Sequence, residues 1–167
     1  MSEQGAAGAG RAARAVFRGV TQLALDGKGR LAIPTRFRDA LAPRREDGTP
    51  DTLVLTVDPS HCLLLYPRAI WDPIQDRLMS LSSFNAEVRS LQRLLVGYAS
   101  EAELDAAGRI LVSPALRRFA SLDHDVVLAG QGNKFEVWDA AKWIEATTRP
   151  VSFPPGTLPS ELDGFSL

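Results

Sequence analysis

Two five-residue segments place an aspartate four residues before an arginine, a spacing typical of a tight turn. They are Asp26-Gly-Lys-Gly-Arg30, the first turn, and Asp105-Ala-Ala-Gly-Arg109, the second turn. The aspartate can accept hydrogen bonds from backbone N–H groups of its turn, and the arginine can pair back to the carboxylate. An arginine can also bind guanine O6 and N7 through its planar guanidinium, and a nearby lysine can bind phosphate. Each segment can therefore serve as a structural turn or as a nucleic-acid contact.

The tips of the two turns differ in chemistry. Lys28 stands between two glycines in the first turn, which removes side chains around it and allows close approach of a phosphate, whereas Ala106 and Ala107 occupy the second. From the residues alone a purely structural turn is the commoner outcome for such a segment. The charge around the first turn favours a nucleic-acid contact.

Basic residues are concentrated around the first turn. The whole chain has a net charge of -1, which by itself argues mildly against nucleic-acid binding. Residues 11–45 nevertheless carry a net charge of +7, because nine basic residues face only Asp26 and Asp39 there. The nine are Arg11, Arg14, Arg18, Lys28, Arg30, Arg36, Arg38, Arg44 and Arg45. Such an asymmetry predicts a protein that binds a polyanion with one face.

The other chemistry-bearing residues do not form a catalytic or metal-binding pattern. His61 and Cys62 are neighbours at a predicted strand start, so their side chains should point to opposite faces. A lone cysteine forms no internal disulfide, and zinc-ligand spacings and phosphate-binding loops are missing from the sequence. The sequence therefore predicts a cytoplasmic protein that is not an enzyme, with no cofactor, metal, membrane span or small-molecule ligand.

The elements that position the two turns repeat along the chain. The turns are offset by 79 residues, and the segments that follow, 53–71 and 125–143, are offset by 72. Each copy is expected to run strand, turn, strand, short helix, strand, turn, strand, helix. The predicted strands are 16–25, 30–33, 52–57 and 62–66 in the first copy, and 99–104, 109–112, 125–128 and 134–138 in the second. The short helices are expected at 34–41 and 114–120.

The copies are joined by a helix and flanked by irregular ends. Asn85 can cap an amphipathic helix over about 86–97. Pro73 either follows the start of the preceding helix at Asp72 or kinks that helix. We divide the chain into an extension (1–15), a first unit (16–83), a linking helix (84–98), a second unit (99–149) and a flexible tail (150–167). The extension is expected to be disordered, or to precede a native start at Val16.

Six ordered blocks between Phe17 and Trp143 resemble the MraZ family of bacterial regulators. They are Phe17-Arg-Gly19, Asp26 to Leu41, Leu63-Leu-Leu-Tyr-Pro67, Arg93-Leu-Leu-Val-Gly-Tyr-Ala99, Asp105 to Arg109, and Gly130-Gln-Gly-Asn-Lys-Phe-Glu-Val-Trp138. The resemblance implies a mainly β, α+β fold. In it, two tandem AbrB-like swapped-hairpin units form an internal pseudo-dimer β-barrel with short helices, and several subunits form a ring.

The resemblance also implies a function. Proteins of this family bind G-rich direct repeats in double-stranded DNA upstream of the division and cell-wall gene cluster, usually as repressors, which implies association with the nucleoid. Lys28 and Arg30 are then expected to contact DNA, with Arg18 and Arg36 as further phosphate contacts. Asp26, Asp105 and Arg109 are expected to be structural turn residues. Two alternatives stay open: an antitoxin-like protein whose tail folds on a toxin, and a ring-shaped scaffold that does not bind DNA.

Overall fold

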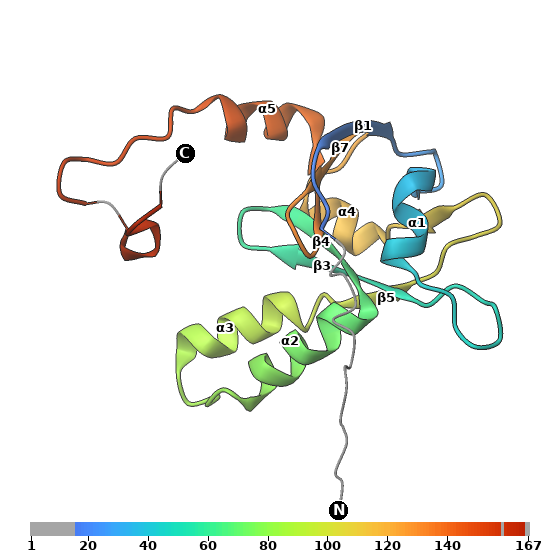
Figure 1. The fold of residues 1–167 in the computed structure, drawn as a ribbon, viewed down its shortest axis with the longest axis horizontal. Helices are drawn as coiled ribbons and strands as arrows, with labels where there is room; N and C mark the ends of the chain where they lie inside the picture. Colours follow the sequence, from blue (N-terminus) through green and yellow to red (C-terminus); the bar gives the residue numbers. More distant parts are fainter. Residues whose placement is uncertain (1–15, 158, 166–167) are drawn as a thin grey trace, which may run out of the picture.

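The computed structural model describes residues 16–157 and 159–165, which form eight strands, five α-helices and one 3-10 turn (Figure 1). The first copy supplies β1 (Val20–Ala24), β2 (Arg30–Ala32), α1 (Thr35–Leu41), β3 (Leu53–Asp58), β4 (Cys62–Pro67) and α2 (Arg68–Ser80). The linking helix is α3 (Ala86–Leu95). The second copy supplies β5 (Ser100–Ala102), β6 (Arg109–Leu111), α4 (Pro114–Phe119), β7 (Asp125–Gly130), β8 (Phe135–Asp139) and α5 (Ala140–Thr148). The fold is therefore α+β, and eight of its fourteen described elements are strands.

The strands of the two copies are interleaved. The larger sheet is antiparallel and has the order β1-β7-β8-β4-β3-β5, and the smaller sheet pairs β2 with β6. The first strand of each copy thus pairs with the third strand of the other copy. A hairpin between β1 and β2 was expected, but within it only Leu25 and Leu31 form an isolated bridge. After the first turn the chain leaves β1 and pairs with the second copy instead.

The described residues do not close a barrel. β1 and β5 form the two edges of the six-stranded sheet, and the β2–β6 pair is a separate sheet. The expected closed β-barrel is therefore not formed by residues 16–157 and 159–165. Because each copy contributes strands to both sheets, neither copy contains a complete sheet of its own.

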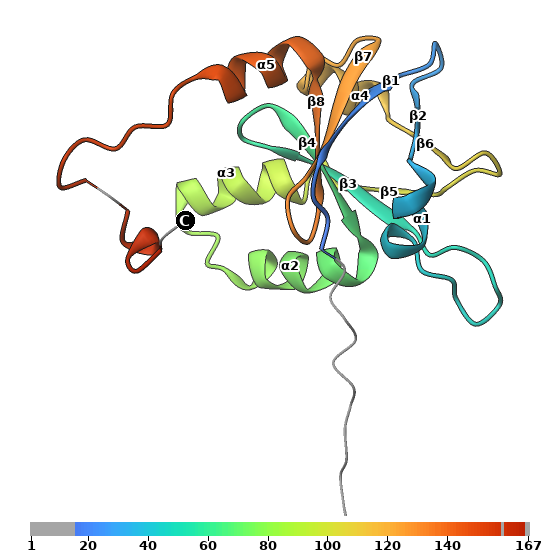
Figure 2. The ribbon, with the colours of Figure 1, turned by 45° about the horizontal axis from the view of Figure 1, so that its top comes forward.

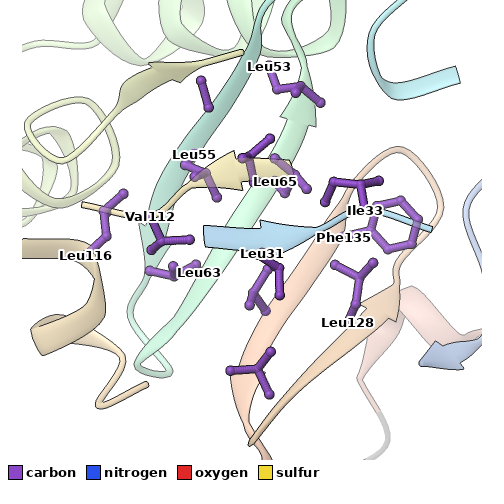
Figure 3. Packing of buried hydrophobic residues seen from close by; sticks show 14 of the residues in the cluster. Leu31, Ile33, Leu53, Leu55, Leu63, Leu65, Val112, Leu116, Leu128 and Phe135 are labelled. Carbon is purple, nitrogen blue, oxygen red and sulfur yellow. The ribbon is translucent and has the colours of Figure 1, made fainter. Parts of the chain in front are cut away.

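The core lies on both faces of the larger sheet, as the alternation of side chains along its central strands requires. On β4, Leu63 and Leu65 join the cluster that also contains Leu31 and Ile33 next to the smaller sheet. Figure 3 shows these side chains gathered with Leu128 and Phe135 around one interior. Cys62, Leu64 and Tyr66 point to the opposite face, where Trp71 of α2 covers them. β4 is therefore buried on both sides.

Several element boundaries differ from the predictions for local reasons. β1 begins at Val20 instead of residue 16, because Gly19 adopts φ +92° and interrupts the extended chain. The helix α2 starts at Arg68 and continues through Pro73, so of the two alternatives left open for Pro73, the start at Asp72 is wrong. The capping role of Asn85 is confirmed, since its side chain accepts hydrogen bonds from the N–H groups of Glu87 and Val88. α3 and α2 lie side by side as a helical pair (Figures 1 and 2).

The ends of the chain add little to the fold. The extension predicted at residues 1–15 lies outside the described residues. In the tail, the described part contains one 3-10 turn, Ser160–Leu162, and its predicted flexibility stays a prediction. None of the helices in the described part of the chain combines the length and hydropathy needed to cross a membrane.

Candidate nucleic-acid interface

The first turn is built around the carboxylate of Asp26. Its Oδ1 accepts hydrogen bonds from the backbone N–H groups of Lys28 and Arg30, each at 2.9 Å. Its Oδ2 accepts a hydrogen bond from Arg30 Nε at 2.7 Å. The hydrogen bond from the Arg30 N–H, followed by the other bonds to this carboxylate, lowers the pKa of Asp26 to about 2. Asp26 is therefore ionised at neutral pH and holds both the backbone and Arg30 in place.

The second turn repeats this arrangement atom for atom. Asp105 Oδ1 accepts from the N–H groups of Ala107 and Arg109 at 2.9 Å, and Oδ2 accepts from Arg109 Nε at 2.9 Å. The hydrogen bond from the Arg109 N–H is the main cause that lowers the pKa of Asp105. Asp105 and Arg109 thus lie together, as do Asp26 and Arg30.

The β2–β6 pair brings the two turns next to each other. Ile33 N–H donates to the carbonyl of Gly108 at 2.9 Å, and Val112 N–H donates to the carbonyl of Gly29 at 2.8 Å. These two bonds are related by the 79-residue offset, so they are equivalents across the internal repeat. Both turns project on the same side of the molecule in Figures 1 and 2.

An electrostatic contact also links the two turns. Arg109 Nη1 lies 3.9 Å from Asp26 Oδ2, so the carboxylate of the first turn contacts arginines from both copies. No such contact to Asp105 from Arg30 occurs among the described residues. The electrostatic contact between the turns is therefore not symmetric.

Each turn is covered by an arginine from the other copy. Arg117 of α4 places its guanidinium against Gly29, where a Cβ would lie only 2.7 Å from Cζ. Arg38 of α1 covers Gly108 in the same way, even more closely. The glycine before each turn arginine therefore has two roles. It adopts a positive φ, 81° at Gly29 and 75° at Gly108, and it leaves space for the covering guanidinium.

The prediction that both glycines of the first turn leave the space around Lys28 open to a phosphate is correct only for Gly27. Gly29 is buried, so its face is not open to an approaching ligand. Gly27 does not have a positive φ, and a Cβ there would meet no heavy atom within 4 Å. Only the side of Gly27 is therefore bare. Lys28 is exposed, and among the described residues its ammonium has no hydrogen bond or ion pair.

Lys28, and the residue that follows each covering arginine, make the charges at the two turns unequal. Positions 38 and 39 of α1 are Arg and Asp, whereas the equivalent positions 117 and 118 of α4 are both Arg. The first turn, counted with Arg117 and the next residue of α4 (Asp26, Lys28, Arg30, Arg117, Arg118), therefore has a net charge of +3. The second turn, counted with Arg38 and the next residue of α1 (Asp105, Arg109, Arg38, Asp39), has a net charge of zero. This separation makes the first turn the better anion site.

The other two predicted DNA contacts lie along β1. Arg36 Nη2 donates to Thr21 Oγ1 at 3.0 Å, which holds this exposed side chain near the start of β1. Arg18 is also exposed but precedes β1, next to Gly130 at the end of β7. At about 3.3 Å per residue, the eight residues from Arg18 to Asp26 span at most roughly 26 Å. The structure thus brings Lys28 and Arg30 together and leaves Arg18 at the far end of the strand.

Sequence reasoning overlooked the second copy as a source of cations for the first turn. Arg38 was noted only as part of the basic stretch, and Arg117 and Arg118 were not considered. The 79-residue offset that aligns the turns also aligns Arg38 with Arg117, and this was the available signal. What the offset does not reveal is that each arginine covers the turn of the opposite copy.

The remaining reactive side chains do not form a competing site. Cys62 is fully buried, and burial strongly raises the pKa of its thiol. His61 is exposed and stacks on Phe119, with 4.8 Å between ring centroids. Among the residues that the structure describes, no three His, Cys, Asp or Glu side chains cluster in a way that could hold a metal ion.

Comparison with known proteins places the chain in a family. Residues 16–94 and 95–152 match the family model described as "MraZ protein, putative antitoxin-like". Proteins named "Transcriptional regulator MraZ" are similar over most of the chain. The relative from Nitrosomonas europaea is 51% identical over 91% of this chain and 100% of its own length. Those from Nitrosospira multiformis and Legionella pneumophila are 53% and 48% identical, with the same coverage. The chain therefore belongs to the MraZ family.

Proposed function

We propose that this chain is a DNA-binding transcriptional regulator, not an enzyme, and that it contacts DNA through its first turn. The observation that carries the proposal is the uncompensated +3 charge around Lys28 and Arg30, on a tip fixed by Asp26. The relatives' name, transcriptional regulator, supports the same function. The protein acts in the cytoplasm on the nucleoid, as a repressor of the division and cell-wall cluster.

The roles of the two turn residues follow from their geometry. Arg30 uses Nε to bind Asp26 at 2.7 Å, and among the described residues its two terminal nitrogens have no hydrogen-bond partner. The side chain is 31% exposed, and a guanidinium with both terminal nitrogens unpaired within the described chain suits bidentate binding to guanine O6 and N7. Lys28 is a point charge at the bare tip and contacts phosphate. Arg36 and Arg18 contact phosphates further along the duplex.

The operator is a set of G-rich direct repeats, and the regulator binds them as a ring of several subunits. One chain offers only a few cationic contacts, so it binds weakly alone, whereas linked turns bind successive repeats together. The strand exchange between β1 and β7 and between β3 and β5 supports a tandem AbrB-like swapped-hairpin pseudo-dimer within each subunit.

The proposal is tested by titrating the full chain against a labelled duplex of its own upstream DNA and a random duplex of equal length. We expect tighter binding to the upstream duplex at every salt concentration. Lys28→Ala should weaken binding to both duplexes alike and make the slope of log affinity against log salt shallower by about 0.9. Arg77→Ala is the control, because Arg77 lies in the last turn of α2, outside the residues proposed to contact DNA, and should leave the slope unchanged.

Two outcomes would contradict the proposal. If the chain binds neither duplex at low salt, it is a scaffold and not a regulator that binds DNA. If Lys28→Ala and Arg77→Ala change the slope equally, the contact is diffuse and does not run through the first turn.

A further inference from the structure

We propose that Arg117, from the second copy, contacts a phosphate of the DNA beside the one bound by Lys28. This inference rests on the proposed function and adds a second-copy residue to a contact surface that otherwise comes from the first copy. Its basis is the position of Arg117 against Gly29, the residue after Lys28.

The bonding of Arg117 is incomplete. Its Nε atom is buried, and among the described residues it has no hydrogen-bond partner. A buried donor without an acceptor is unfavourable, and for a charged group more so. The equivalent residue Arg38 differs, because its Nε donates to the carbonyl of Ile33 at 2.8 Å. Arg38 is thus held in place, whereas Arg117 loses no hydrogen bond at Nε when it moves.

A hollow beside Arg117 provides room for such a movement and for an anion. It has a volume of about 440 Å³ and is lined by Pro114, Arg117, Arg118, Ser121 and Leu122. Its polar lining consists of two guanidinium groups and one hydroxyl, with no carboxylate, which is the chemistry that binds phosphate.

The equivalent hollow at the second turn provides an internal comparison. Its volume is about 270 Å³, and its lining includes the carboxylates of Asp39 and Asp105 beside Arg38 and Arg44. Acidic groups at that hollow repel a phosphate and neutralise the arginines. The two arginines that cover the turns are therefore equivalent in sequence but not in their availability to an anion.

The functional step follows from these contacts. When a duplex lies on the first turn, Arg117 rotates toward the hollow and donates to a phosphate oxygen. The unpartnered nitrogen then gains an acceptor in a charge-assisted hydrogen bond. Because the arginine comes from α4, this contact ties the second copy to the DNA held by the first.

The test compares Arg117→Met with Arg38→Met in the full chain, after light scattering and thermal unfolding have confirmed intact assembly. Binding to the upstream duplex is measured from 50 to 200 mM salt. For Arg117→Met we expect the slope of log affinity against log salt to be shallower than the wild-type slope by about 0.9. The ratio of wild-type to variant affinity should then fall about threefold over this salt range. Arg38→Met and Arg117→Lys should keep the wild-type slope, because the first retains Arg117 and the second retains a cation at the site.

A second measurement uses the protein with Arg117 in place. The Nε–H resonance of Arg117, assigned by its loss in Arg117→Lys, should shift when the upstream duplex is added, whereas that of Arg38 should not. If wild type prefers the upstream duplex but the slope of Arg117→Met and the Arg117 resonance are both unchanged, the inference fails and the proposed function stands. If wild type shows no preference, both fail.

Discussion

The two Asp-x-x-x-Arg turns have the same backbone hydrogen bonds and the same aspartate–arginine pair, yet they differ in charge by three units when the two helix residues beside each turn are counted. The hydrogen bonds that stabilise each turn do not involve the side chains at its tip, which are Lys28 in the first turn and Ala106 and Ala107 in the second. The tip and the covering helix are free to vary, and they differ between the copies. The comparison shows that one local structure can be retained for stability while only one of its two versions acquires the charge that suits an anion.

The cause of the difference lies in the strand exchange. Because β2 pairs with β6, α4 packs over the first turn and α1 over the second. Arg118 and Asp39 occupy equivalent positions on these helices and have opposite charges. The two arginines of α4 therefore add positive charge to that of Lys28 at the first turn. At the second turn, the oppositely charged pair on α1 adds no net charge to the apolar tip at Ala106 and Ala107.

The largest expected effect concerns the number of DNA-binding turns that act together. If each chain has one such turn, a ring needs several repeats in the DNA to engage several turns. Replacing all repeats but one by random sequence, at constant duplex length, should weaken binding on the order of 10²-fold or more, because the effective concentration gained by linked sites is lost. Fluorescence anisotropy measures both affinities. Equal affinity for the two duplexes would show that a single turn is sufficient.

The next effect separates the two turn arginines. Arg30→Ala should leave assembly intact but cost about 1–3 kcal/mol of base discrimination for each engaged turn, roughly a 5- to 150-fold loss of preference for upstream over random DNA. Both substitutions should lower stability, since Asp26 and Asp105 each lose a partner, but Arg109→Ala should leave base discrimination unchanged in intact assemblies. Light scattering and competition binding distinguish these outcomes. The comparison breaks down if Arg109→Ala abolishes specific binding in intact assemblies while Arg30→Ala binds normally.

A smaller effect tests whether the backbones of the two turns are equivalent. Gly29→Ala and Gly108→Ala should each destabilise the fold by roughly 1–2 kcal/mol, because alanine is strained at positive φ. Each new Cβ would also press on the covering arginine. Gly27→Ala is the matched control and should change stability by less than about 0.5 kcal/mol, because its surroundings are open. Urea unfolding of the three variants measures this. If Gly29→Ala and Gly108→Ala cost no more than Gly27→Ala, the positive φ does not constrain the two turns.

The smallest expected effect is on the stability of the folded state at acid pH. The folded pKa of Asp26 lies near 2, below its ordinary value of 3.8, so ionised Asp26 stabilises the folded state above pH 3.8. That contribution is lost as the pH falls from 3.8 through about 2. The pKa of Asp105 is lowered in the same direction, so its contribution disappears over the acid range too. Asp26→Asn and Asp105→Asn should each flatten the dependence of stability on pH below 4.

Urea midpoints at pH 5, 4 and 3 check this prediction. Asp26→Asn should flatten the profile more than Asp105→Asn, because Asp26 also lies 3.9 Å from Arg109. A profile that is unchanged by either substitution would show that the aspartates do not stabilise their turns through charge.

The sequence by itself determined the local structure of the chain. Turn chemistry predicted the bonding of Asp26 and Asp105, the cap at Asn85 was visible from residue type, and ordered motifs identified the family. These features depend on residues close together in the chain, so residue type and spacing are sufficient to predict them.

Only the tertiary structure decided which copy covers which turn. A strand's pattern of apolar residues states which face is buried but not which strand is its neighbour, so the pairing of β2 with β6 could not be obtained from it. The contact of Arg117 with Gly29 joins positions 88 residues apart, and it exists because that pairing carries α4 across to the first turn. The local motif therefore predicted a turn, and its electrostatic surroundings followed from packing between distant segments.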